Sequence, residues 1–156
     1  MHSTRSGLRE LESLYELLPY FLRAGFTPFL PEFDSGVDFI AYREKRINEV
    51  HDLLIKVQLK SRWTIDRKYL GRSIAIAFKD SGWWYVIPHD NMVSVAETAG
   101  YTATGSWERG NYSIGSMNKA LRDHSRAWRL NRSDSIDSTD CGQNEEVWQG
   151  LAKGQS

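Results

Sequence analysis

The stretch DLLIKVQLKS, residues 52–61, decides the fold class of this chain because it predicts a strand with two different faces. Successive side chains of a strand point to opposite faces, so this alternation separates an apolar side from a polar side. The apolar side carries Ile55, Val57 and Leu59, and the polar side carries Lys56, Gln58 and Lys60. We therefore expect a strand that packs one face on the core and carries polar side chains on the other face, where they could bind or react with a ligand.

The segments on both sides of this strand predict more strands and three helices. The predicted strands are residues 26–33, 37–42, 73–78 and 83–87, and the predicted helices are residues 7–24, 89–98 and 117–130. Residues 43–51 predict a hairpin connection, residues 62–72 a basic turn-like segment and residues 99–116 a long loop. Because several strands are consecutive, we expect an α/β (α+β) fold whose mixed central sheet is flanked by helices.

The first predicted helix carries one apolar stripe, which we expect to face the core. It consists of Leu8, Leu11, Tyr15, Leu18 and Leu22. Pro19 lies inside this pattern, and a proline there kinks a helix or ends it early. Gly25 is a typical stop signal after the last turn.

The chain has 156 residues and 40% hydrophobic residues, which fits one domain with one core. We assign residues 1–130 to that domain and residues 131–156 to a polar, acidic tail. We expect this tail to be disordered apart from a weak contact by Val147 and Trp148. The single cysteine, Cys141, cannot form an internal disulfide, so a reducing, cytoplasmic location is expected. The polar N-terminal residues indicate no signal peptide, and no apolar run is long enough for a membrane span.

Charge is distributed unevenly although the formal net charge is zero. Residues 43–72 carry nine Lys and Arg against four Asp and Glu, and residues 119–132 carry five against one. From Ser133 onward, one basic residue stands against five acidic ones. A basic body suits a nucleic-acid partner, whereas an ordinary solvated surface with a solubilising tail gives the same counts.

Asp38 is the first candidate catalytic residue because it follows a turn and begins an otherwise apolar strand. If that strand lies beside residues 52–61, the side chains of Asp38, Gln58 and Lys60 converge on one point. A carboxylate and an amide oxygen suit a hard cation such as Mg²⁺, which activates water for phosphodiester hydrolysis. A lysine there stabilises developing negative charge. The competing interpretation is a solvated polar face of an edge strand.

A carboxylate from the first helix is the candidate for completing the metal site. Glu12 is the first choice because it lies nearest the edge of the apolar stripe, followed by Glu10 and then Glu16. A solvated helix face accounts equally for all three.

Gly36-Val37-Asp38 followed by Val57-Gln58-Leu59-Lys60 resembles the core motif of the PD-(D/E)xK nuclease superfamily, the restriction endonuclease-like group that includes Holliday-junction resolvases and some homing endonucleases. The resemblance covers roughly residues 8–90. It implies a restriction endonuclease-like core in which Asp38, residue 58 and a helix carboxylate such as Glu12 bind metal. Lys60 would be the catalytic lysine, and a homodimer would be a common assembly.

Two positions depart from the family pattern. Gln58 stands where most members have a carboxylate, as in some homing-endonuclease-like members, and no proline directly precedes Asp38. The resemblance implies a metal-dependent DNA endonuclease that uses Mg²⁺ or Mn²⁺. The glutamine favours an alternative, a catalytically inactive module of the same fold that binds DNA or a protein. A third hypothesis is an interaction domain with a tryptophan-rich surface.

Basic and aromatic residues follow the lysine strand and recur on the last helix, where they would flank a phosphate backbone. The predicted DNA-binding residues are Arg62, Trp63, Arg67, Lys68, Arg72 and Arg126. A solvated face with Trp63 in the core is the competing interpretation. His89-Asp90 could form a metal ligand or a general base, although a helix cap is the commoner role for such a pair.

Overall fold

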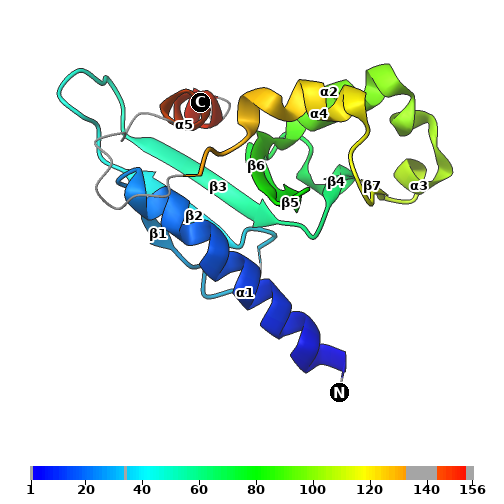
Figure 1. Ribbon diagram of the computed structural model, residues 1–156, viewed down its shortest axis with the longest axis horizontal. Coiled ribbons are helices and arrows are strands. Elements are labelled where there is room, and N and C mark those ends of the chain that lie inside the picture. Colours follow the sequence, from blue (N-terminus) through cyan, green and yellow to red (C-terminus); the bar gives the residue numbers. More distant parts are fainter. Residues whose placement is uncertain (1, 34, 133–143, 154–156) are drawn as a thin grey trace.

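A computed structural model describes residues 2–33, 35–132 and 144–153, and Figure 1 shows their arrangement. The helices are α1 (His2–Arg23), α2 (His89–Ala99), α3 (Gly105–Glu108), α4 (Lys119–Ser125) and α5 (Glu145–Lys153), with 3₁₀ turns η1 (Arg67–Tyr69), η2 (Tyr101–Ala103) and η3 (Arg126–Trp128). The strands are β1 (Thr27–Phe29), β2 (Phe39–Arg43), β3 (Leu53–Leu59), β4 (Trp63–Asp66), β5 (Ile74–Asp80), β6 (Trp83–Pro88) and β7 (Asn111–Ile114).

Five strands form a mixed sheet in the order β1-β2-β3-β5-β6. Strands β1, β2 and β3 form an antiparallel meander, β3 pairs with β5 in parallel, and β6 returns antiparallel to β5. The parallel pair needs a crossover connection, and residues 60–73 supply it with β4 and η1. This confirms the expected α+β class with a mixed sheet. It also confirms that the strand after Asp38 and the strand before Lys60 are neighbours.

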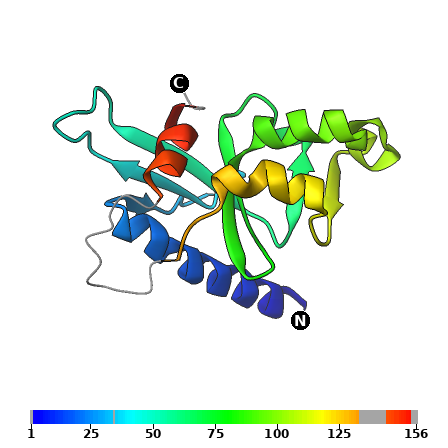
Figure 2. The same cartoon turned by 45° about the horizontal axis from the view of Figure 1, so that its top comes forward.

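Each face of the sheet has its own core. One core joins α1 and α5 to the sheet through Leu17, Phe21, Val57 and Trp148, all of which are buried. The other core lies on the opposite face, and its buried residues come from β4, η1, α2, α4 and the strands β5 and β6. Figure 2 shows α1 and α2 on different sides of the strands. The alternation predicted for residues 53–59 is present, because Leu53, Ile55 and Val57 are buried in the first core.

Two segments that we predicted as turn-like or loop contain short strands. Within residues 62–72, β4 is followed by η1, and within residues 99–116, β7 follows η2 and α3. β4 and β7 form a separate two-stranded antiparallel sheet, in which Trp63 pairs with Ile114 and Asp66 pairs with Asn111. Their four-residue length and the small polar residues around them hide the strand pattern in the sequence.

The expected disorder of the tail is wrong for Glu145–Lys153, which form the helix α5, whereas the expected contact by Val147 and Trp148 is present. Val147, Trp148 and Leu151 are buried against the sheet. The helix is amphipathic, so its three apolar residues gain from burial although the surrounding sequence is polar. Residues 133–143, which the same prediction included, lie outside the described residues.

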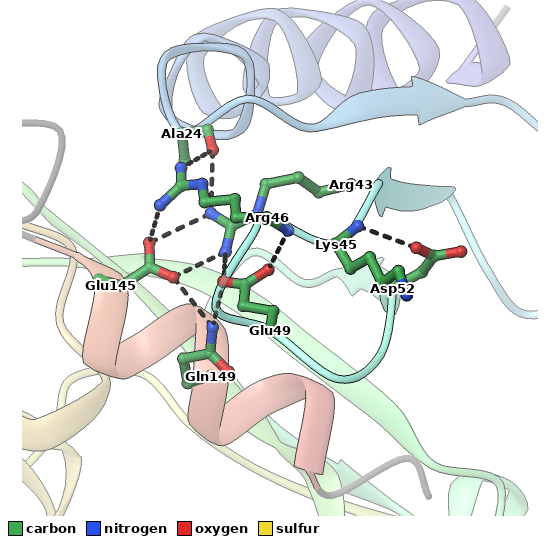
Figure 3. Close-up of polar contacts among 8 residues, drawn as sticks. All are labelled: Ala24, Arg43, Lys45, Arg46, Glu49, Asp52, Glu145 and Gln149. Carbon is green, nitrogen blue, oxygen red and sulfur yellow. Dashed lines mark hydrogen bonds and ion pairs between the residues drawn. The ribbon is translucent and has the colours of Figure 1, made fainter.

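An ion-pair network fixes α5 to the hairpin of β2 and β3 (Figure 3). Arg43, which is 4% exposed, donates to Glu145 Oε1 at 2.6 Å and to Oε2 at 3.1 Å, and it also pairs with Glu49 at 3.1 Å. Hydrogen bonding to Arg43 lowers the pKa of Glu145 and raises that of Arg43. Gln149 donates to both carboxylates. A bidentate pair of this kind stabilises a short helix that has few other polar contacts.

The apolar stripe of α1 does not face the core as we expected. Leu8, Leu11, Tyr15 and Leu22 are 61%, 47%, 65% and 55% exposed. The buried side of α1 is instead formed by its second apolar face, with Leu17 and Phe21 at its centre. Pro19 lies within the helix without ending it. Among the described residues, no helix is long and apolar enough to cross a membrane.

Candidate active site

The pairing of β2 with β3 brings Asp38 to Gln58. Phe39 pairs with Val57, and the backbone N–H of Asp38 donates to the carbonyl of Val57 at 2.8 Å. The carboxylate of Asp38 then accepts a hydrogen bond from the backbone N–H of Leu59, with 2.7 Å between Oδ2 and the nitrogen. The half-buried Asp38 side chain therefore lies against the backbone that joins Gln58 to Lys60. This brings the Asp38 carboxylate to the backbone of the segment that carries Gln58 and Lys60.

Lys60 lies on the sheet face opposite α1, where Tyr69 from η1 forms part of the second core. The ammonium nitrogen of Lys60 is 5.4 Å from the centre of the Tyr69 ring, and that of Lys68 is 5.0 Å from it. A buried aromatic ring attracts such cations and limits their motion. Tyr69, which is 1% exposed, therefore gathers two lysines beside the strand that carries Gln58. Tyr69 was not among the predicted site residues, because the position of its ring depends on the η1 turn.

The turn before Asp38 is held by Arg72. Arg72 donates from Nη2 to the carbonyl of Ser35 at 2.7 Å, and its own carbonyl accepts from Lys56 Nζ at 2.5 Å. Gly36 has φ +75°, and a Cβ there would lie 3.1 Å from Arg72 Nη1 and 3.3 Å from Tyr69. A glycine is thus required both for the backbone conformation and for the close approach of these side chains. Arg72 is thereby placed next to the turn that leads into Asp38.

His89, at the first residue of α2, packs edge-on against Tyr69 with ring centres 5.6 Å apart. Its Nε2 accepts a hydrogen bond from the backbone N–H of Asp66 at 3.0 Å, and the side chain is 1% exposed. Burial lowers the pKa of His89, against a smaller opposing effect of Asp90. A neutral ring that accepts at Nε2 carries its proton on Nδ1. His89 therefore packs against the Tyr69 ring and uses its Nε2 lone pair within the fold. This structural role fits neither the metal-ligand nor the general-base hypothesis.

The donor set near Asp38 suits a hard cation only in part. Asp38 supplies a carboxylate and Gln58 a neutral amide oxygen, both of which Mg²⁺ accepts as ligands. Within residues 2–33, 35–132 and 144–153, no three His, Cys, Asp or Glu side chains lie together in a way that could hold a metal ion. A cation bound here would have to complete its shell with water and substrate oxygens, as Mg²⁺ commonly does.

The helix carboxylates are less favourably placed than we predicted. Glu12 is exposed, and helical spacing turns it well away from the buried face of α1 formed by Leu17 and Phe21. Glu10 lies on the same face of α1 as Leu17 but about two turns earlier, since seven residues separate the two. Glu16 forms an ion pair with Lys79. Because α1 packs on the sheet face opposite Lys60, these placements give the predicted helix carboxylate no support.

The predicted DNA-binding residues divide into two groups. Trp63 is 2% exposed in the second core, so its assignment to a DNA surface is corrected to a packing role. Five basic residues of the prediction are exposed: Arg62, Arg67, Lys68, Arg72 and Arg126. Lys68 and Arg72 flank Tyr69, whereas Arg126 lies in η3 and pairs with Asp123 at 3.7 Å. Lys60 and Lys68 therefore lie beside the Tyr69 ring, and Arg72 lies at the turn that leads into Asp38.

Comparisons of the chain with protein-family models, with curated proteins and with solved structures found no match. The functional assignment therefore depends on the sequence motif and on the geometry around Asp38. That geometry holds the Asp38 carboxylate on the backbone N–H of Leu59 and the Lys60 ammonium beside the Tyr69 ring, at the end of β3 in the mixed sheet.

Proposed function

We propose that this protein is a metal-dependent DNA endonuclease with a restriction endonuclease-like core of the PD-(D/E)xK kind. The observation that carries this proposal is the hydrogen bond from the Leu59 N–H to the Asp38 carboxylate at 2.7 Å. It joins two motif segments that lie 21 residues apart in the chain. The parallel pairing of β3 with β5 after a crossover also suits such a core.

Each residue then has a defined role. Asp38 and the amide oxygen of Gln58 would hold a Mg²⁺ or Mn²⁺ ion, which activates water and neutralises charge on the scissile phosphate. Lys60, restrained beside the Tyr69 ring, would stabilise the negative charge that develops on the phosphate oxygens. Lys68 and Arg72 would contact flanking phosphates, which positions the duplex without reading its sequence.

The test is cleavage of supercoiled plasmid and of branched DNA with Mg²⁺ or Mn²⁺, alongside the Asp38→Ala and Lys60→Ala variants. We expect nicking that requires the metal and is lost in both variants. The matched control is Lys119→Ala, since Lys119 is an exposed lysine of α4 that pairs with Asp123. Metal-independent nicking, or equal loss in the control, would contradict the assignment.

A second candidate is an inactive module of the same fold that binds DNA through the same cations. Gln58 favours this candidate, because a neutral ligand holds Mg²⁺ more weakly than a carboxylate does. It is also favoured because the described part of the chain has no cluster of three His, Cys, Asp or Glu side chains that could hold a metal ion. This candidate predicts DNA binding that weakens with salt and is indifferent to metal and to Asp38→Ala. Fluorescence anisotropy at several salt concentrations, with and without Mg²⁺, separates the two functions.

A further inference from the structure

The N-terminal half of α1 projects beyond the sheet, as Figure 1 shows. Its apolar side chains are exposed. Leu8, Leu11 and Tyr15 are 61%, 47% and 65% exposed. The buried residues of α1, such as Leu17 and Phe21, lie in its C-terminal half. Removing apolar surface from water is favourable, so an exposed apolar stripe on a projecting helix marks a surface for contact with another molecule.

The spacing of this stripe identifies the shape of its partner. Leu8, Leu11, Tyr15, Leu18 and Leu22 follow one another at steps of three and four residues. This is the a and d pattern of a heptad repeat, which packs against a helix of the same repeat. The core of the monomer uses a different face of α1, so the two functions of the helix do not compete except at the partly buried Leu18.

The charges beside the stripe point to a second copy of this chain in antiparallel orientation. Arg5 and Glu12 are both exposed and both occupy the position that directly follows d in the heptad. In an antiparallel pair centred between Leu8 and Leu11, each Arg5 lies opposite Glu12 of the other copy, and each Leu8 packs on the other Leu11. A parallel pair would place Gly7 opposite Glu12 and would form no such ion pair.

We propose that the protein forms a homodimer through antiparallel pairing of the α1 helices. The helix overlap is centred on the projecting half, so the two sheets lie at opposite ends of the paired helices. Tyr15 extends the apolar contact on each side of the Leu8 and Leu11 layers. The proposal is independent of the nuclease assignment, because it uses neither Asp38 nor Lys60.

Sedimentation velocity over a concentration series tests the proposal on the full-length protein, whose monomer mass is 18.0 kDa. We expect a species of twice this mass that Leu8→Ser with Leu11→Ser converts to monomer. Ile47→Ser is the matched control, because Ile47 is a fully exposed apolar residue outside α1. A wild-type monomer throughout the series, or a dimer that survives the double substitution, would overturn the proposal.

Charge reversal tests the orientation without removing apolar surface. Arg5→Glu and Glu12→Arg should each weaken the dimer by roughly tenfold, since each creates like-charge pairs on both sides of the interface. The two substitutions combined in one chain restore opposite charges and should recover most of the affinity. If the combined variant is as weak as the single ones, antiparallel pairing is wrong. Circular dichroism checks that each variant keeps its helix content.

Discussion

The carboxylate of Asp38 and the backbone N–H of Leu59 are 2.7 Å apart, and this hydrogen bond ties the start of β2 to the end of β3. Asp38 also donates its own N–H to the carbonyl of Val57 at 2.8 Å. The carboxylate is thus held by two strands and not by a mobile loop. A site with this degree of preorganisation suits both metal binding and catalysis.

Removing the Asp38 acceptor should affect stability as well as chemistry. In Asp38→Ala the half-buried Leu59 N–H loses its partner, at a cost of about 1–3 kcal/mol in the free energy of unfolding. Asp38→Asn keeps an acceptor oxygen and should cost less than Asp38→Ala. Urea denaturation of the two variants measures this difference. Equal stability of both variants and the wild type would show that the hydrogen bond contributes nothing to the fold.

Gln58→Glu should strengthen metal binding, because it replaces a neutral oxygen ligand with a charged one and introduces the carboxylate of the motif that this segment resembles. We expect a lower Mg²⁺ concentration for half-maximal cleavage in this variant, by roughly tenfold. A titration of the nicking rate against Mg²⁺ measures the change. Gln58→Ala is the control and should shift the titration in the opposite direction. A titration unchanged in both variants would remove Gln58 from the metal site.

Arg43→Ala should destabilise the protein strongly. It leaves Glu145 and Glu49 without their shared cation and opens a gap beneath α5, for an expected cost of about 3–5 kcal/mol. Glu145→Gln keeps hydrogen-bonding capacity beside Arg43 and should cost less. Thermal unfolding with far-ultraviolet circular dichroism compares the two. If Arg43→Ala unfolds like the wild type, α5 is not fixed to the sheet by this network.

His89 should make stability depend on pH. Burial lowers the pKa of His89 in the folded state below its ordinary value, so protons bind preferentially to the unfolded chain. This cost is absent above the unfolded pKa of about 6.5 and grows as the pH falls below it, until the folded pKa is reached. We therefore expect the free energy of unfolding to decrease from pH 7.5 to about 5. His89→Gln should reduce this slope, and an unchanged slope would assign the effect to other groups.

Much of the sheet could be predicted because its strands alternate or are strongly apolar. Residues 52–61 show this most clearly, and their pairing with Asp38's strand followed from the hairpin between them. The small sheet of β4 and β7 could not be predicted, because four-residue strands with polar neighbours leave no reliable period. α5 was missed for another reason: its apolar residues are few, and its burial depends on a distant partner, Arg43.

Helix α1 shows a limit of periodicity. It has two apolar faces, and the pattern of Leu8, Leu11 and Tyr15 is as regular as that of Leu17 and Phe21. Which face packs on the sheet depends on tertiary contacts, and the sequence does not specify them locally. The same limit applies to the site, where Asp38, Gln58 and Lys60 were predicted together. The supporting ring of Tyr69 was not predicted, because it reaches Lys60 only through the η1 turn.

The most direct test of the central claim is the metal-dependent nicking rate of Asp38→Asn compared with the wild type, at matched folded concentration and saturating DNA. This substitution keeps the size and an acceptor atom of Asp38 but removes the charge that would hold the cation. We predict that the rate falls by at least about a hundredfold while DNA affinity stays within a few fold. A rate close to that of the wild type, under both Mg²⁺ and Mn²⁺, would contradict the assignment of Asp38 as the metal-binding carboxylate of a nuclease.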